Sequence, residues 1–97
     1  MEINNKDFDS KIIGKIKEAF EVKREETHHI VYKIYYNGNQ IARTYRSHGD
    51  NEMSDKAIFG VRRQLHLSLQ ELKDLKNCPL TADSYKNLLK QRGIIKE

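Results

Sequence analysis

Three of the four histidines lie at the two ends of one stretch of the chain, residues 27–49. His28 and His29 are near its start and His48 is near its end. Imidazole titrates near neutral pH, so one histidine can take the proton of a ribose 2′-hydroxyl while another protonates a departing 5′-oxygen. Metal-free RNA cleavage needs these two proton transfers. His28, His29 and His48 are therefore the candidate catalytic residues.

Cationic and aromatic side chains lie between these histidines and in the segment after them. Cations can stabilise the charge that develops on phosphorus, and tyrosines can stack on splayed bases. The net charge of +4 also suits an anionic partner. We expect this partner to be RNA, single-stranded or messenger RNA. The candidate nucleic-acid-binding residues are Lys33, Tyr35, Arg43, Arg46, Arg62 and Arg63.

The sequence gives little support for a metal or a cofactor. It contains no glycine-rich phosphate loop, no paired-cysteine zinc spacing and no His-Glu-x-x-His motif. His28 and His29 could meet His48 and Cys78 around zinc, but adjacent strand residues point to opposite faces of a sheet. We therefore expect no metal site and no cofactor.

The single cysteine, Cys78, cannot form an intramolecular disulfide, which fits a reducing compartment. We expect it to be a small buried residue. The N-terminus has no apolar run after a basic start, and no segment approaches the ~18 apolar residues of a membrane span. These features predict a soluble, cytoplasmic protein that does not associate with a membrane.

A β-hairpin must position the histidines. Two runs of β-branched and aromatic residues flank Asn37-Gly38, a dipeptide that accepts the positive φ angles of a tight turn. In the first strand Ile30, Tyr32 and Ile34 share one face and predict its buried side, which turns His29 outward with Val31, Lys33 and Tyr35. In the second strand, residues 40–47, the pattern does not show which face is buried. One face holds Ile41, Arg43 and Tyr45; the other holds Ala42, Thr44, Arg46 and His48.

Helices precede and follow the hairpin. An apolar stripe predicts a first helix that begins near Asp7 to Asp9, after a frayed segment 1–6. Segment 22–26 is either a polar connection or the outer end of the first strand. Three further helices are predicted to begin after Ser54, Ser68 and Thr81, the second with a capping box that ends at Glu71.

These elements predict one α+β domain over residues 1–97. We expect a small antiparallel β-sheet, with its central hairpin at about residues 27–48 and the helices packed on one face. The expected order is α-β-β(-β)-α-α-α. The chain has no repeats, low-complexity tracts or long linkers that would mark a domain boundary.

The stretch from His28 to about Glu71 resembles the body of HicA-type toxins, small mRNA interferases of toxin–antitoxin systems. Thr27-His28-His29 resembles their histidine-rich strand start, Asn37-Gly38-Asn39 the hairpin and Ser47-His48-Gly49 the strand end. The helix expected at 54–67 is similar to their closing helix. The resemblance implies a double-stranded-RNA-binding-domain-like body at about 7–67 with a C-terminal helical extension at 68–97. It also implies metal-independent endoribonuclease activity, His28 as the catalytic histidine and an antitoxin protein as a partner.

Other functions and partners stay open at this stage. The same basic sheet could serve a non-catalytic RNA-binding module. Residues 54–77 could instead form a DNA-reading helix-turn-helix, although the charges of the second helix suit that role poorly. An interaction-only or antitoxin-like protein is a third alternative, and a homodimer is a candidate assembly. Strand alternation favours His29 as the outward-facing catalytic group, whereas the resemblance favours His28.

Overall fold

A computed structural model describes residues 3–49, 51–77 and 79–96. The expectation that Cys78 is buried falls outside these residues. The elements follow the predicted order, and the α+β class with one antiparallel sheet is confirmed. They are α1 (Asn5–Asp7), η1 (Phe8–Ile13), α2 (Gly14–Ile16), β1 (Glu21–Glu26), β2 (Ile30–Tyr36), β3 (Asn39–Arg46), α3 (Asp55–Gln64), α4 (Leu69–Asn77) and α5 (Ala82–Gln91).

The first helix begins earlier than the sequence predicted. α1, η1 and α2 follow one another without a break, and η1 has π-helical pitch. Asn4 is the N-cap, since its side-chain oxygen accepts from the Asp7 N–H at 2.7 Å. The expected fraying of segment 1–6 is wrong for its described part: Ile3 is buried, and its carbonyl accepts from the Met53 N–H at 2.8 Å. A contact with a distant segment therefore orders the start of the chain.

The sheet has the strand order β1-β2-β3, with antiparallel pairs throughout. The hairpin turn is confirmed, because Asn37 and Gly38 have φ angles of 51° and 81°. Ile30, Tyr32 and Ile34 of β2 are buried, as predicted. Val31, predicted to face outward, is buried as well, because it lies in the central strand between Glu25 and Tyr45. Segment 22–26 belongs to a strand of its own, β1. The structure settles the phase of β3, whose buried residues are Ala42, Thr44 and Arg46.

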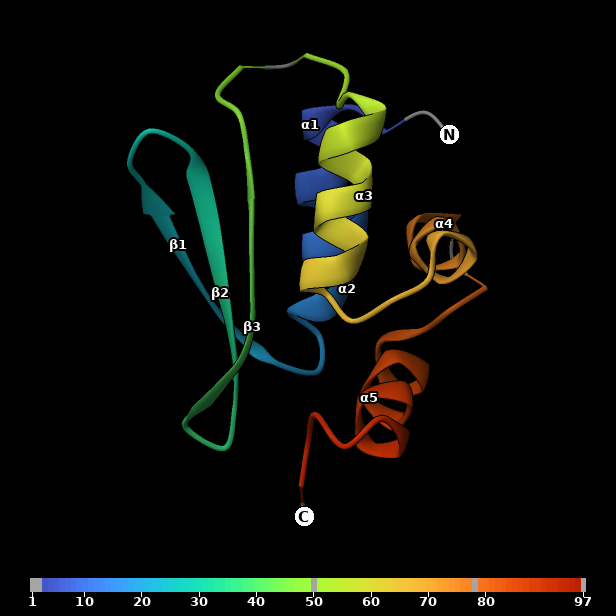
Figure 1. The fold of residues 1–97 in the computed structure, drawn as a ribbon. Coiled ribbons are helices and arrows are strands. Elements are labelled where there is room, and N and C mark those ends of the chain that lie inside the picture. Colours follow the sequence, from blue (N-terminus) through green and yellow to red (C-terminus); the bar gives the residue numbers. More distant parts are fainter. Residues whose placement is uncertain (1–2, 50, 78, 97) are drawn as a thin grey trace.

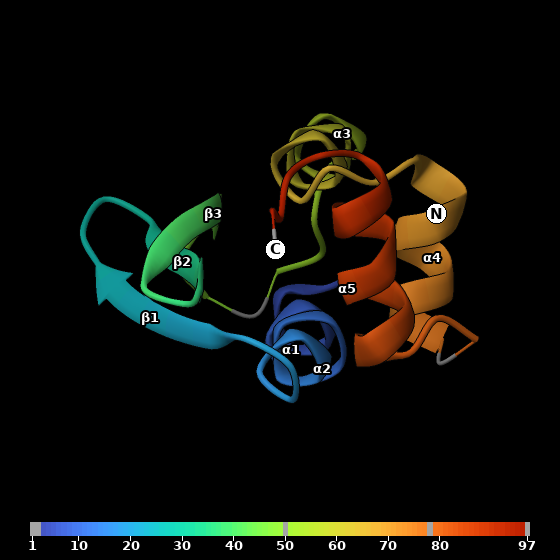
Figure 2. The ribbon, with the colours of Figure 1, turned by 90° about the horizontal axis from the view of Figure 1, so that it is seen from below.

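The helices cover one face of the sheet in two layers (Figures 1 and 2). The first helix and α3 lie next to the sheet, and α4 and α5 pack behind them. The core between the layers is apolar and draws on η1, α2 and the three later helices, with Phe8, Ile12, Ile58, Leu65, Leu72, Leu75, Tyr85 and Leu89 among its residues. The Lys15 ammonium donates to the Leu75 carbonyl at 2.7 Å and so ties the first helix to the end of α4.

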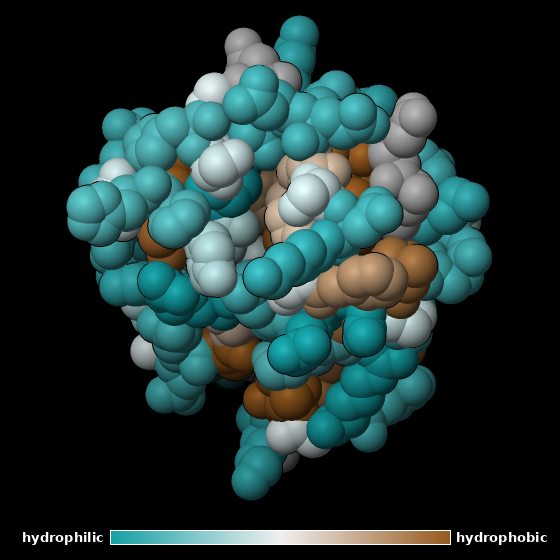
Figure 3. All heavy atoms as spheres, turned by 45° about the horizontal axis from the view of Figure 1, so that its top comes forward, coloured by the Kyte–Doolittle hydropathy of each residue, from teal (hydrophilic) through white to brown (hydrophobic). Residues whose placement is uncertain are grey.

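Hydrophilic residues cover most of the surface in the view of Figure 3, and hydrophobic atoms show there only in small patches. Within the described residues, no helix has both the length and the apolar character that a bilayer span requires.

The predicted caps of the later helices are present. Ser54 accepts from the Ala57 N–H, and Thr81 accepts from the Ser84 N–H, each at 3.1 Å. At the start of α4, Ser68 accepts from the Glu71 N–H at 3.1 Å while the Glu71 carboxylate accepts from the Ser68 N–H at 2.8 Å. This is the reciprocal capping box, and Arg92 also forms an ion pair with Glu71.

We expect Glu71→Gln to lower stability in a pH-dependent way. The bond from Arg92 and the capping contacts with Ser68 hold the pKa of Glu71 below its ordinary value of 4.5. A lowered folded-state pKa contributes stability above the unfolded pKa that is lost as pH falls through the folded pKa. Glutamine can keep the cap but not the ion pair. The free energy of unfolding of the wild type should therefore exceed that of the variant by up to about 1 kcal/mol at neutral pH, and this difference should shrink below pH 4.5.

Urea unfolding at several pH values checks this prediction. Glu18→Gln is the matched control, because Glu18 is exposed and has no ion-pair partner among the described residues. A difference that stays constant down to pH 3 would show that Arg92 does not stabilise the Glu71 carboxylate.

Candidate nucleic-acid interface

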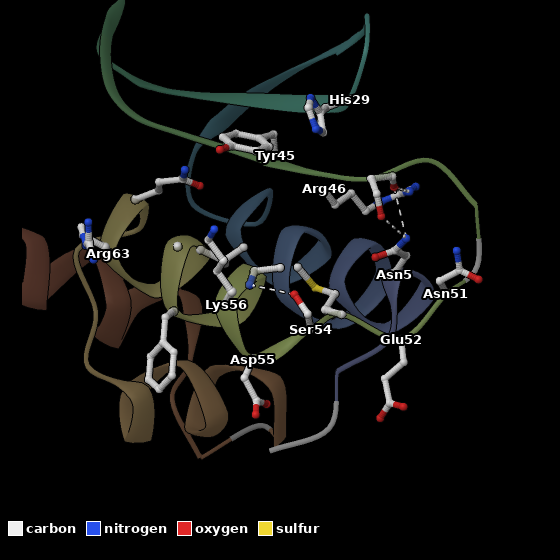
Figure 4. A pocket seen from close by; sticks show the side chains of 17 residues that line it. Asn5, His29, Tyr45, Arg46, Asn51, Glu52, Ser54, Asp55, Lys56 and Arg63 are labelled. Carbon is white, nitrogen blue, oxygen red and sulfur yellow. Dashed lines mark hydrogen bonds between the residues drawn. The ribbon is translucent and has the colours of Figure 1, made fainter.

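A groove of about 910 Å³ lies between the β3 edge of the sheet and α3. β3 is the last strand of the sheet, so one of its edges has no strand partner among the described residues. Near the hairpin this edge is covered: the Thr44 hydroxyl donates to Gln64 Oε1 at 2.9 Å, and the His66 ring donates to the Ile41 carbonyl at 3.1 Å. Towards the far end of β3 the edge borders the groove. Figure 4 shows side chains of the sheet and of α3 on its two sides.

His29 and Tyr45 form the sheet side of the groove. His29 precedes β2 and lies on the outer side, as strand alternation predicted, because Ile30 next to it is buried. Its ring centroid is 5.0 Å from that of Tyr45, with the planes tilted by 57°. Both side chains line the groove, and Tyr45 is 39% exposed. An imidazole therefore stands beside an accessible aromatic face at the rim of the groove.

The other two candidate histidines lie outside this groove lining. His28 is exposed in the turn between β1 and β2 and has no hydrogen bond or ion pair within the described ranges. The His48 ring donates from Nε2 to the Thr27 carbonyl at 2.9 Å. The two ends of the hairpin thus meet, as expected from antiparallel pairing, and His48 holds the turn that carries His28 and His29. In neutral His48 this bond leaves Nδ1 without a proton.

Two cations form the helix side of the groove. Lys56 and Arg63 both line it, and both are exposed. Neither has an ion-pair partner in the part of the chain that the structure describes. Sequence reasoning named Arg63 but missed Lys56. The available signal was helical spacing, since residues 56, 60 and 63 follow one another at i, i+4 and i+7 on one helix face.

The outer face of the sheet, turned away from the helices, is also basic and aromatic. Strand register places Lys23, Lys33 and Arg43 in one row across the three strands. The Lys23 ammonium lies 4.9 Å from the centroid of the Tyr35 ring, and the Arg43 guanidinium 5.6 Å from that of Tyr45. Lys33 forms a 3.0 Å ion pair with Glu25, so its charge is partly compensated. The row leads towards Tyr45 and the groove.

Arg46, a candidate nucleic-acid-binding residue, lies on the buried face of β3. Its side chain is only 9% exposed and faces the helices. Its Nε and Nη2 atoms donate to the Asp9 carboxylate at 2.8 and 2.6 Å, and the Tyr32 hydroxyl donates to the same carboxylate at 2.8 Å. The bonds to Asp9 raise the pKa of the Arg46 guanidinium. Arg46 is therefore a structural cation, although part of it reaches the groove wall.

Arg62 lies outside the lining of the groove. It is half-buried, and its guanidinium is 5.8 Å from the centroid of the Phe59 ring. The outward cation of the Arg62-Arg63 pair is thus Arg63.

Asn5 and Arg46 hold the segment that leaves β3. The buried Asn5 amide donates to the carbonyls of Ser47 and Gly49 at 3.1 and 2.9 Å, and Arg46 Nη1 donates to the Ser47 carbonyl at 2.8 Å (Figure 4). Sequence reasoning missed this role of Asn5, because it placed the residue in a frayed segment. These bonds fix the backbone on either side of His48.

Comparison with protein-family models, with curated proteins and with solved structures finds no match. Among the described residues, no group of three or more His, Cys, Asp or Glu side chains could hold a metal ion. What the protein does is therefore inferred from the chemistry of the groove and the outer face.

Proposed function

We propose that the protein binds RNA in the groove and along the outer face, and cleaves it without a metal through His29. One observation carries this proposal. His29 packs against Tyr45 at the rim of a groove whose opposite wall presents two uncompensated cations, Lys56 and Arg63. A proton-transfer group, a stacking surface and phosphate-binding charges thus share one site.

The reaction requires few groups. His29 takes the proton of a ribose 2′-hydroxyl, and the 2′-oxygen attacks the adjacent phosphorus as the bond to the 5′-oxygen breaks. The departing 5′-oxygen takes its proton from water, and protonated His29 returns its own proton to the solvent. Lys56 and Arg63 stabilise the negative charge that gathers on the phosphate oxygens. The products are a 2′,3′-cyclic phosphate and a free 5′-hydroxyl. His48 serves as a positioning residue, since its bond to the Thr27 carbonyl fixes the turn before His29.

The order of elements also supports the proposal. Residues 5–64 run helix, three strands, helix. This is the order of a double-stranded-RNA-binding domain, the body that the resemblance to HicA-type toxins implies. The resemblance put the catalytic role on His28, but the lining of the groove favours His29. We therefore assign the proton transfer to His29.

Incubation of the purified protein with single-stranded RNA in EDTA tests this function. We expect cleavage that survives chelation, products with 2′,3′-cyclic phosphate ends, and no cleavage at a position that carries a 2′-deoxyribose. Cleavage that depends on an added divalent ion, or that proceeds at the 2′-deoxy position, would contradict the mechanism. Binding without cleavage would select the non-catalytic RNA-binding module.

We expect the affinity for RNA to depend on salt through the cations of the groove. Displacing counterions from a single strand changes the slope of log affinity against log salt by about 0.7 per phosphate contact. Lys56→Ala and Arg63→Ala should each make the slope shallower by about that amount, as measured by fluorescence anisotropy. Lys73→Ala is the matched control, because Lys73 is exposed on α4 and does not line the groove. Equal slopes for all three variants would place the phosphate contacts elsewhere.

A further inference from the structure

Gly60 occupies a position in α3 where glycine is unfavourable. It lies in the middle of a ten-residue helix, where glycine is the least favourable residue apart from proline. Packing does not require it, because a Cβ atom added there would meet no heavy atom within 4 Å. Gly60 lines the groove, one turn from Lys56 and one turn from Arg63. A missing side chain at such a place is typical of a backbone that a ligand approaches closely.

We propose that Gly60 keeps the α3 wall open for one unpaired base of the RNA strand, which stacks on Tyr45 inside the groove. This inference rests on the proposed function and narrows it to single-stranded RNA read one base at a time at this site. The flanking Lys56 and Arg63 then contact the phosphates on either side of the inserted nucleotide.

The exposed aromatic side chains favour a ligand with a flat ring, such as a nucleic-acid base. Three large hydrophobic side chains are exposed among the described residues, and two of them, Tyr45 and Phe59, line this groove. The volume of about 910 Å³ lies in the range of small-molecule sites. Bases stack on tyrosine whatever their sequence, and only an unpaired base can leave its helix to do so.

Charge favours RNA over a peptide. A peptide strand could pair with the free edge of β3, but its neutral backbone would leave Lys56 and Arg63 without partners. The carboxylates of Glu52 and Asp55 also line the groove and would repel an acidic peptide and RNA phosphates alike, so the phosphates are placed at Lys56 and Arg63. A nucleotide places a neutral base against Tyr45 and Gly60 and its phosphates against the two cations.

Gly60→Leu tests the inference, with Asn87→Leu as control on the exposed surface of α5. The probe is a single-stranded RNA with one 2-aminopurine and a fluorescent end label, in EDTA at low temperature. Loss of one base stack weakens binding by about 5- to 150-fold. We expect a loss in this range for Gly60→Leu and for Tyr45→Ala, none for Asn87→Leu, and quenching of 2-aminopurine when the wild type binds.

Stability measurements separate obstruction of the groove from misfolding. Gly60→Leu and the second variant, Gly60→Gln, should both unfold at a higher temperature than the wild type, because glycine is replaced by better helix formers. A stable Gly60→Leu that binds RNA as tightly as the wild type would overturn the inference and leave the proposed function standing. Binding without any change in 2-aminopurine emission would also overturn it, and a wild type that binds a peptide but no RNA would overturn both proposals.

Discussion

Replacing His29 with alanine will slow RNA cleavage by about 10²- to 10⁴-fold while the protein stays folded and still binds RNA. This is the usual contribution of a positioned proton-transfer group. The His29 side chain is exposed and makes no hydrogen bond or ion pair within the described residues, and alanine keeps the carbonyl that accepts from the Thr27 N–H, so its loss should cost little stability. Single-turnover cleavage and RNA affinity, measured on the same preparation, separate the chemical step from binding.

The other histidines of the hairpin provide controls for the His29 variant. His28→Ala should leave the rate nearly unchanged, since His28 is exposed and lies outside the groove lining. His48→Ala should cause a smaller loss than His29→Ala, because His48 acts through the turn that it holds. If His28→Ala removes activity and His29→Ala does not, the catalytic role belongs to His28, as the resemblance implied.

Arg46→Ala should lower the free energy of unfolding by about 3 kcal/mol. Removing one partner of a buried ion pair typically costs ~3–5 kcal/mol, because the other charge is left uncompensated. The lower end applies here, since the Asp9 side chain is 33% exposed and can recover some hydration. The variant also loses the bond that Arg46 donates to the Ser47 carbonyl. Urea unfolding with an unchanged m-value is the measurement.

Arg43→Ala is the matched control for Arg46→Ala. It removes the same side chain from the same strand, but from the exposed face, where most substitutions stay within about 0.5 kcal/mol. A double-mutant cycle with Asp9→Ala should then give a coupling energy of ~0.5–3 kcal/mol. Equal costs for Arg46→Ala and Arg43→Ala would show that the Asp9 pair does not hold the sheet to the first helix.

Short-range rules predicted much of the fold. The Asn37-Gly38 turn, the buried face of β2 and the capping box at Ser68 each depend on residues within a few positions, and each is present. The sequence did not predict β1 as a separate strand, because this segment is almost entirely charged. As an edge strand it is exposed along most of its length, and charge on such a strand protects the edge from pairing with other chains.

Which face of β3 is buried could not be predicted, because each face carries an arginine. Arg43 and Arg46 lie on opposite faces, and local sequence does not show which of them has a buried partner. That partner is Asp9, 37 residues earlier. The groove escaped prediction for a similar reason: strand pairing brings His29 beside Tyr45, but only the packing of α3 beside β3 adds Lys56.

The most direct test of the central proposal is to map where RNA contacts the chain. Amide resonances should be followed by NMR while a single-stranded 2′-fluoro RNA, which cannot be cleaved through a 2′-oxygen, is added. We predict shifts at His29, at Tyr45 and along residues 54–63, with smaller shifts on the outer face and none in α4 or α5. Shifts confined to α4 and α5, with β3 and α3 unchanged, would contradict the proposed site.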